Sequence, residues 1–368
     1  MSTTAQTYTK ENPFLTDLLV NEKLNKEGSQ KDTRHFEISL KGSDIEYLPG
    51  DSLYVFPENE ASLVNQFLDL VELTQSREKE FERFTKEVNI TKASSKLFKL
   101  IETKLADAND KDSKELAAPY EGYNIPNIIA DVKAKHDISF TTDEIIENSS
   151  KLMARAYSIA SSLSAHPGEV HLCIARVDEE INGQKVLGVC SNFLSERVKL
   201  NGKNVRIYVH VNERFRLPQN TETNIIMVGP GTGIAPFRAF IEERNSQRDA
   251  GEKIGLDWLF FGDQRATFDY LYAEEFAAYA NKYNLKISTA FSRDQEEKVY
   301  VQHRMIEQGD EIFKLLESGA HFYVCGDARR MAKDVDSALR EIVSKNGKDA
   351  DEYMKALKDS GRYQRDIY

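Results

Sequence analysis

The chain has 368 residues, of which 40% are hydrophobic and 30% are charged, and its formal net charge is −11. These values are ordinary for a globular protein of roughly two or three domains, and the acidic excess argues against a nucleic-acid or anionic-membrane partner, because phosphate surfaces attract basic proteins. No apolar run reaches the roughly 20 residues that span a bilayer, and the N-terminus has no basic-then-apolar signal pattern, so we expect a cytoplasmic protein without membrane contact.

Residues 33–56 predict β-structure. Phe36 and Ile38 place apolar side chains two positions apart, which is the period of a strand. Residues 49–51 (Pro-Gly-Asp) predict a turn, and a second expected strand, residues 52–56, ends at a proline. This pattern is typical of the start of an antiparallel barrel or sandwich.

Residues 58–150 have a different composition, rich in Lys, Glu, Leu, Ala and Phe. Leu63 and Phe67 illustrate the helical spacing of the apolar residues, and the charged segment Asp107–Lys114 predicts a loop. We therefore expect a mostly helical insertion. Strand-like segments return after it, at residues 153–160, 169–177 and 204–211.

Residues 219–368 alternate short apolar strands with amphipathic helices, which predicts a doubly wound parallel sheet. The expected strands are residues 224–228, 257–261, 286–291 and 321–325. The expected helices are residues 236–248, 271–283, 302–318 and 328–346. The predicted fold class is α/β plus β-barrel: an antiparallel barrel (1–57 and 151–218), a helical connecting insertion (58–150) and the parallel-sheet domain (219–368).

The strongest motif is Gly229-Pro230-Gly231-Thr232-Gly233, between a buried strand and an expected helix. Glycines let backbone N–H groups approach an anion, and a helix start adds a favourable dipole, so the motif indicates pyrophosphate binding. A turn without a ligand is the alternative, but three glycines in five residues cost backbone entropy without a reason. The motif is neither the standard GxGxxG nor a P-loop.

A second segment, Ser292–Gln302, follows the third expected strand of the same domain. A site for NAD would favour an acidic residue about 20 positions after the glycines. Here Arg293 and Lys298, with hydroxyl and amide side chains nearby, could instead bind a 2′-phosphate. A solvated charged loop would explain such a stretch in isolation, but its place in this domain favours the phosphate.

Four weaker motifs complete the set. Arg155–Ser162 (RAYSIASS) offers an Arg for a pyrophosphate, a Tyr to stack on a flavin ring and a Ser hydroxyl, although a plain strand is the alternative. Gly188–Leu194 (GVCSNFL) could present N–H groups to a second pyrophosphate, or Ser191 could simply cap a helix. Tyr323–Asp327 (YVCGD) ends a strand where ligands bind, with a core thiol as the alternative. Gly361–Tyr368 could cap a flavin, or fray.

The chain has three cysteines, at positions 173, 190 and 325, and seven scattered histidines. An odd, widely spaced set of cysteines predicts reduced thiols rather than a disulfide framework. Neither residue type has metal-ligand spacing, so we expect no metal site.

In chain order, PGDSLYVFP, RAYSIASS, GVCSNF, GPGTGIAPFRAF, LFFGDQR, SRDQEEKVYVQH, YVCGDARRMAKDV and GRYQRDIY resemble the diflavin reductases of the ferredoxin–NADP reductase-like superfamily, from about residue 8 to 368. The terminal RYQRD-x-Tyr is similar to that of the NADPH–sulfite reductase flavoproteins. The resemblance implies that the barrel binds FAD and that the last domain binds NADPH. Diflavin reductases also have an FMN domain of about 150 residues, and we expect this chain to lack one.

The resemblance also implies roles for individual residues. The implied FAD-binding residues are Thr91, Arg155, Ala156, Tyr157, Ser158, Cys173, Ile174, Ala175, Gly188, Val189, Cys190, Ser191 and Tyr368. The implied NADPH-binding residues are Gly231, Thr232, Ser292, Arg293, Lys298, Val299, Tyr300, Val301, Gln302 and Asp334. The implied hydride path is lined by Ser158, Cys325, Asp366 and Tyr368.

The predicted function is therefore hydride transfer from NADPH to FAD, followed by single-electron delivery to an FMN domain, a flavodoxin or a sulfite reductase haemoprotein. One alternative is a stand-alone NADPH–flavodoxin or ferredoxin reductase. An alternative of another class is a flavin-free scaffold that kept the fold. The intact set Arg155, Ser158, Arg293 and Asp366 argues against the scaffold, because a scaffold needs none of them.

Overall fold

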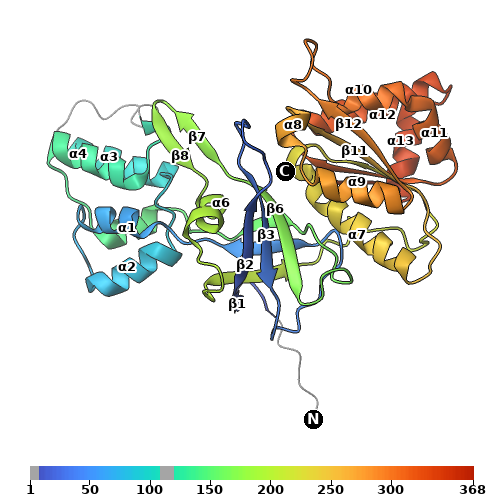
Figure 1. Cartoon of the computed structure of the whole chain (residues 1–368). Helices are drawn as coiled ribbons and strands as arrows, with labels where there is room; N and C mark the ends of the chain where they lie inside the picture. The colour runs from blue at the N-terminus through green and yellow to red at the C-terminus, as the bar shows by residue number, and fades with distance from the viewer. Residues whose placement is uncertain (1–7, 108–119) are drawn as a thin grey trace. The chain divides into compact units, whose positions relative to one another are not determined.

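The computed structural model describes residues 8–107 and 120–368 (Figure 1). These residues form two compact units. The first comprises the described parts of residues 1–54, 156–175 and 200–368, and the second comprises those of residues 55–155 and 176–199. Each unit is described by itself.

The first unit begins with antiparallel sheets. One has the strand order β2-β3-β6: β2 (Leu18–Lys23), β3 (Thr33–Ser39) and β6 (Glu169–Ala175). The other has the order β1-β9-β4-β5: β1 (Phe14–Thr16), β9 (Val205–His210), β4 (Ser52–Phe56) and β5 (Arg155–Ser158). Phe36 and Ile38 of β3 are buried as predicted, but His35 and Ser39 are buried as well, so burial does not alternate strictly along the strand.

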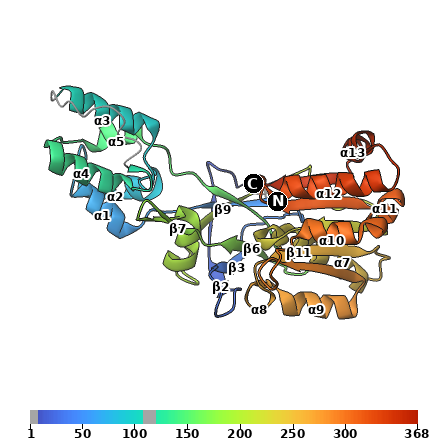
Figure 2. The same cartoon turned by 90° about the horizontal axis from the view of Figure 1, so that it is seen from above.

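The same unit continues as a five-stranded sheet of order β12-β11-β10-β13-β14, in which every pair is parallel. Its strands are β10 (Ile225–Val228), β11 (Asp257–Asp263), β12 (Leu285–Phe291), β13 (His321–Gly326) and β14 (Tyr363–Ile367). Its helices are α7 (Ala235–Asp249), α8 (Ala266–Asp269), α9 (Ala273–Lys282), α10 (Val301–Glu307), α11 (Gly309–Glu317), α12 (Met331–Lys345) and α13 (Ala350–Asp359), drawn in yellow to red in Figures 1 and 2.

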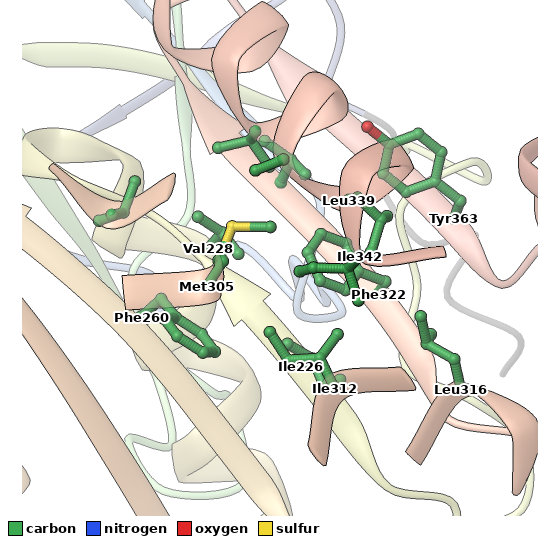
Figure 3. Packing of buried hydrophobic residues seen from close by; sticks show 14 of the residues in the cluster. Ile226, Val228, Phe260, Met305, Ile312, Leu316, Phe322, Leu339, Ile342 and Tyr363 are labelled. Carbon is green, nitrogen blue, oxygen red and sulfur yellow. The ribbon is translucent and has the colours of Figure 1, made fainter. Parts of the chain in front are cut away.

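The two faces of this sheet bury different helices. Ile226 and Val228 of β10 pack with side chains of α10 to α13, whereas Ile225 and Met227 face the opposite side and pack with α7 and α9. Figure 3 shows the first of these clusters, with Phe260 of β11 among the helix side chains. The apolar strands are therefore covered on both faces, as the doubly wound prediction requires.

The second unit contains the expected helical insertion. Its helices are α1 (Ala61–Leu68), α2 (Arg77–Lys86), α3 (Ser95–Asp107), α4 (Ile125–His136) and α5 (Thr142–Asn148). A capping box between Thr141 and Glu144 starts α5, and the Asn124 side chain accepts a hydrogen bond from Asn127 N at the start of α4. The remaining elements are the hairpin β7 (Asp178–Ile181) and β8 (Gln184–Leu187), α6 (Val189–Asn192) and a π-helical turn, Phe193–Arg197.

Several elements differ from the sequence expectations. The helix expected at 302–318 is divided at Gln308 into two helices, α10 and α11. The side-chain amide of Gln308 donates a hydrogen bond to Ser288 Oγ, which holds the chain at this break. Helix α13 and strand β14 were not predicted, and the Asp107–Lys114 loop lies outside the described residues beyond Asp107. Residues 176–199 group with the helices of the second unit, while the division into the three predicted domains stays a prediction.

Two predictions for the whole chain concerned its cysteines and the absence of a membrane-spanning segment. Cys173, Cys190 and Cys325 are all buried and form no disulfide. Among the helices of residues 8–107 and 120–368, none combines the length and the apolar composition needed to cross a bilayer.

A buried ion-pair cluster joins α7 to the start of β11. The carboxylate of Asp257 is fully buried, and its oxygens lie 2.5 Å from Nε of Arg244 and 2.7 Å from Nη2 of Arg248. Burial raises the pKa of Asp257, while the two guanidinium groups oppose this rise. Because Arg244 is itself buried, loss of the carboxylate would leave a positive charge in the core without compensation.

Replacement of Asp257 by alanine (Asp257→Ala) should lower the free energy of unfolding by about 3–5 kcal/mol, the cost of breaking a buried ion pair from one side. Urea denaturation followed by the fluorescence of Trp258, the single tryptophan and the next residue in β11, measures the loss. Asp351→Ala is the control, because its carboxylate pairs with Arg340 at the surface and should contribute little. Equal losses in the two variants would contradict the role given to Asp257.

Candidate functional site

The glycine motif forms a tight turn between β10 and α7. Gly231 has φ +56°, and residues 231–234 form a single 3₁₀ turn. A Cβ on Gly233 would lie 2.2 Å from the carbonyl oxygen of Cys325, and a Cβ on Gly229 would lie 2.4 Å from the carbonyl oxygen of Gly233. Close packing against β13 and within the turn therefore accounts for two of the glycines, and Gly231 is the one that borders open space.

A cavity of about 510 Å³ lies at the carboxyl ends of the parallel strands. It is lined by residues that follow β10, β11, β12 and β13, where doubly wound sheets bind their ligands. The lining residues are Lys31, Pro230, Gly231, Gly262, Asp263, Gln264, Ala290, Ser292, Tyr300, Val301, Gln302, Asp327, Arg330, Met331 and Asp334.

The cavity gathers part of the predicted NADPH set. Ser292, Tyr300, Val301, Gln302 and Asp334 line it, together with Gly231. The Gln302 amide Nε2 donates to Asp334 Oδ2 at 3.3 Å, which links the two predicted contacts. Ser292 is bound through its N–H to the carbonyl of Asp263 at 2.9 Å, so the loop after β12 is anchored to the end of β11.

Arg293 and Lys298 do not line the cavity but are exposed on the loop beside it. Arg293 Nη1 donates to Gln30 Oε1 at 3.3 Å. Within the described residues, neither cation has a carboxylate oxygen within 4.0 Å, and the same holds for Arg330. Val299, the residue after Lys298, is half-buried and packs against the core. Cations without acidic partners beside a cavity suit an anionic ligand.

Ser158, Cys325 and Asp366 lie together at the same sheet edge. Ser158 Oγ donates to Asp366 Oδ2 at 2.6 Å, and Asp366 is paired in register with Cys325 across β13 and β14. Burial raises the pKa of the Cys325 thiol well above its usual range, and the Asp366 carboxylate raises it further. The thiol is therefore neutral near pH 7, so it lines the site and does not act as a nucleophile.

Tyr368 ends the chain beside the glycine turn. Its hydroxyl lies 2.8 Å from Thr232 Oγ1, and its backbone N–H donates to the carbonyl of Gly326 at 3.1 Å. The side chain nevertheless remains 63% exposed. The alternative of a frayed end is wrong, because β14 pairs with β13 up to Ile367.

In the second unit, a separate cavity of about 290 Å³ gathers Thr91, Arg155, Gly188 and Val189 from the predicted FAD set. Gly188 begins α6, and a Cβ there would lie 2.7 Å from Ser191 Oγ. The capping alternative for Ser191 is wrong, because its Oγ bonds to Val177 N and to the Gly188 carbonyl and caps no helix N–H.

Other predicted FAD contacts do not line either cavity. Cys173 lies in the core of the first unit against Tyr272, and burial raises the pKa of its thiol to about 12. Ile174 is buried and Ala175 is exposed at the end of β6. Cys190 is buried with Sγ 3.8 Å from the carbonyl oxygen of Val55. Ala156 is exposed and Tyr157 is half-buried on β5. Their roles stay predictions.

The residues at these cavities that the sequence reasoning missed include four charged ones, Lys31, Asp263, Arg197 and Arg330. Arg330 follows the β13 strand within the YVCGDARRM motif, so its position at the carboxyl edge was a usable signal. Arg197 lines the second cavity from the π-helical turn, and its Nη2 donates to the carbonyl of Glu58 at 2.6 Å. Asp263 ends β11 within the LFFGDQR motif, so it had the same kind of signal, whereas Lys31 lies outside the quoted motifs.

Two family models match the chain. Residues 227–337 match the oxidoreductase NAD-binding domain, and residues 6–104 and 122–193 match the FAD binding domain. The chain carries both domains. This confirms the predicted fold, barrel-like antiparallel sheets followed by a parallel sheet, and it supports the predicted cofactors, FAD and NADPH.

Curated relatives of these two domains are named sulfite reductase [NADPH] flavoprotein alpha-component. The relative from Bacillus subtilis (strain 168) is 41% identical over 379 residues, which cover 98% of this chain and 62% of that protein. The relative from Vibrio cholerae serotype O1 is 39% identical over 386 residues, covering 100% of this chain and 61% of that protein. The two-domain chain thus spans about three fifths of the length of the relatives it matches.

The packing of the glycine turn predicts the effect of Gly233→Ala. The added Cβ meets the Cys325 carbonyl, so either the turn or the end of β13 must move, and affinity for NADP⁺ should fall at least about tenfold, or about 1.4 kcal/mol. Isothermal titration calorimetry measures this. Gly347→Ala is the matched control, because its Cβ would meet nothing within 4 Å and only backbone strain is added. Unchanged NADP⁺ affinity in Gly233→Ala would refute the packing argument.

Proposed function

We propose that the chain is an NADPH-dependent FAD flavoprotein reductase, which passes reducing equivalents from NADPH through FAD to a separate acceptor. One observation carries the proposal: the Ser158–Asp366 hydrogen bond and the buried Cys325 lie at the sheet edge that also holds the glycine turn and its cavity. A hydroxyl fixed by a carboxylate, beside a neutral thiol, suits a site where two rings meet and a hydride crosses between them.

The chain's own residues fit both cofactors. For NADPH, the cavity of about 510 Å³ is bordered by Gly231 and by two cations, Lys31 and Arg330, of which Lys31 is paired with Asp263. For FAD, Arg155 and Gly188 share a cavity in which a side chain at position 188 would collide with Ser191. Arg155 would neutralise the pyrophosphate there, and Ser292, Tyr300 and Gln302 would hold the adenosine end of NADPH.

When both cofactors are bound, their rings supply the hydride donor and acceptor, and the protein supplies position and water exclusion. Asp366 accepts the hydrogen bond of the Ser158 hydroxyl and so orients it. The one proton of this hydroxyl therefore points toward the Asp366 carboxylate. Cys325 contributes a neutral surface, because burial keeps its thiol protonated. The Tyr368 hydroxyl is held beside the turn by Thr232, and its backbone N–H by the Gly326 carbonyl, so Tyr368 would act as a gate if a bound nicotinamide ring took the position of its side chain.

The acceptor is the less determined part of the proposal. The relatives are named as flavoprotein components of a sulfite reductase, which favours a sulfite reductase haemoprotein, reached directly or through an FMN domain or flavodoxin. The alternative is a reductase that serves a flavodoxin or ferredoxin unconnected with sulfur. Reconstitution with a sulfite reductase haemoprotein or with a flavodoxin, measuring NADPH oxidation, separates them.

Visible spectroscopy tests the proposed function. The purified protein, incubated with FAD and then separated from unbound FAD by gel filtration, should show the flavin bands, and anaerobic addition of NADPH should bleach them much faster than the same concentration of NADH. A protein fraction that carries no flavin bands after this separation would refute the assignment. Equal bleaching by the two dinucleotides would refute only the preference for NADPH.

Removal of the Tyr368 side chain (Tyr368→Ser) should change the preference for NADPH over NADH. Without the ring, a nicotinamide can stack without the help of the 2′-phosphate contacts, so the ratio of kcat/KM for NADPH to that for NADH should fall at least about tenfold. Stopped-flow reduction of the bound flavin measures the ratio. Tyr353→Phe, on α13 and remote from this edge, is the control. An unchanged ratio would count against the gating role.

A further inference from the structure

A buried arginine on α7 contacts the segment that carries Ser158. Arg238 lies in the first turn of α7, directly after the glycine turn, and its side chain is 6% exposed. Its Nη1 donates to the carbonyl of Ala160 at 2.7 Å. Ala160 lies two residues after Ser158, whose hydroxyl belongs to the proposed hydride site. The helix that begins at the glycine turn is thus bonded to the backbone beside Ser158.

Glu242, one helical turn further along α7, contacts the same segment. Its Oε2 accepts the backbone N–H of Ser162 at 2.8 Å, and its side chain is 1% exposed. Its Oε1 lies 2.8 Å from Nη2 of Arg238 and 3.0 Å from Nε2 of His166. Residues four positions apart lie on the same face of a helix. Two neighbouring side chains of α7 therefore hold this segment by its main-chain groups.

The guanidinium group of Arg238 is itself held in one orientation. Nε and Nη2 donate to the two carboxylate oxygens of Glu275 on α9, at 2.8 and 3.0 Å, and Cζ lies 5.0 Å from the centre of the Tyr272 ring. Bidentate arginine–carboxylate bonds add geometric specificity as well as energy. Burial opposes the charge, but Glu242 and Glu275 raise the pKa of Arg238 above its usual range, so the group stays charged.

The segment held by Arg238 runs to the hydride site with only one residue between them. Ser158 ends β5, the Ile159 N–H donates to the carbonyl of Asp51 at 3.0 Å, and the Ala160 N–H donates to the carbonyl of His171 at 2.8 Å. A displacement of the Ala160 carbonyl would therefore move Ser158 as well. The glycine turn, in contrast, is continuous with the first turn of α7.

Stability alone does not account for this buried group of charges. Apolar side chains of similar volume often stabilise a core as well as a buried ion pair does. A guanidinium group and a carboxylate instead fix directions, because each hydrogen bond requires its partner at a defined place. Here the fixed partners are a carbonyl and an N–H of the segment that follows Ser158.

We propose that Arg238 and Glu242 are positioning residues for hydride transfer, which hold Ser158 at a fixed place relative to the glycine turn. Neither residue lines the two cofactor cavities, so they act through the main chain of residues 158–162. The inference rests on the proposed function, since the transfer concerned is the one from NADPH to FAD.

Amide hydrogen exchange of the full chain without cofactors tests whether Arg238 fixes this segment. Arg238→Lys keeps a positive charge near Glu242 and Glu275, but an ammonium group cannot reproduce the fork that reaches both Glu275 oxygens and the Ala160 carbonyl. Exchange of a peptide that covers residues 156–164 should become at least about threefold faster, because its main chain loses a fixed partner.

Stopped-flow reduction of the bound FAD by NADPH tests the effect on the reaction. In Arg238→Lys the limiting rate at saturating NADPH should fall about tenfold, because a shift of a fraction of an ångström at the reacting groups is enough for such a loss. The apparent Kd for NADPH should stay within about threefold of the parent value, because the dinucleotide cavity is unchanged.

A double variant tests whether Arg238 acts through Ser158. In the Ser158→Ala background, Arg238→Lys should slow the limiting rate by less than about twofold, because the hydroxyl that Arg238 positions is already absent. If Arg238→Lys does not fold, Glu242→Gln carries the same expectations. Its amide cannot accept hydrogen bonds from Ser162, Arg238 and His166 together, and Arg238 keeps its pair with Glu275.

Arg248→Lys is the matched control on the same helix. Arg248 also binds a buried carboxylate, that of Asp257 at 2.7 Å, and also donates to a backbone carbonyl, that of Gly255 at 2.9 Å. These bonds lie at the other end of α7. The control should lose stability to urea as Arg238→Lys does, but its exchange at residues 156–164 and its limiting rate should equal those of the parent.

Four outcomes would overturn the proposal: unchanged exchange in Arg238→Lys, an unchanged limiting rate, equal slowing in Arg248→Lys, or additive effects of Arg238→Lys and Ser158→Ala. Failure of the proposed function gives a different result. A parent protein whose bound flavin is not reduced by NADPH would refute that function. A parent that is reduced by NADPH, with Arg238→Lys reduced at the same rate, would refute only the positioning role.

Discussion

The backbone of Gly233 lies so close to β13 that any side chain there would meet the Cys325 carbonyl at 2.2 Å. This contact fixes the glycine turn against the strand that carries Cys325, and the register of β13 with β14 then places Asp366 next to the thiol. Thr232, within the same turn, reaches the Tyr368 hydroxyl. One close approach between two backbones therefore helps to set the positions of Cys325, Asp366 and Tyr368, three of the groups on which the proposed hydride transfer depends.

The last strand has a structural role as well as a chemical one. β14 extends the parallel sheet by one strand, and Tyr363 packs in the core beside Phe322. Asp366, within this pairing, and Tyr368, just after it, thereby gain fixed places at the carboxyl edge. A terminus that would fray in isolation is held by the sheet it completes.

Charge compensation distinguishes the two ends of the parallel-sheet domain. At the start of β11, Asp257 forms ion pairs with two arginines and joins this strand to α7 in the core. At the other end of the same strand, Asp263 is compensated by one lysine from a distant hairpin, and both residues line a cavity. The first arrangement is closed to solvent, whereas the second includes a partly exposed cation.

The parallel sheet, the helical insertion and the glycine turn could be predicted from the sequence alone. Each depends on local periodicity or on turn chemistry, which a single chain segment expresses: Phe36 and Ile38 alternate in β3, and residues 229–233 need the freedom of glycine. Family motifs also identified Ser292, Gln302 and Asp334, which share one cavity.

The partners of these residues follow from the folding of the whole chain. It placed Lys31 beside Asp263 across 232 positions and Ser158 beside Asp366 across 208, and it turned Cys173 into the core. It also showed that Gly229 and Gly233 are required by packing as much as by a ligand. The physical reason is that ion pairs, close backbone contacts and cavities arise between segments distant in the chain, and their geometry depends on how whole layers pack.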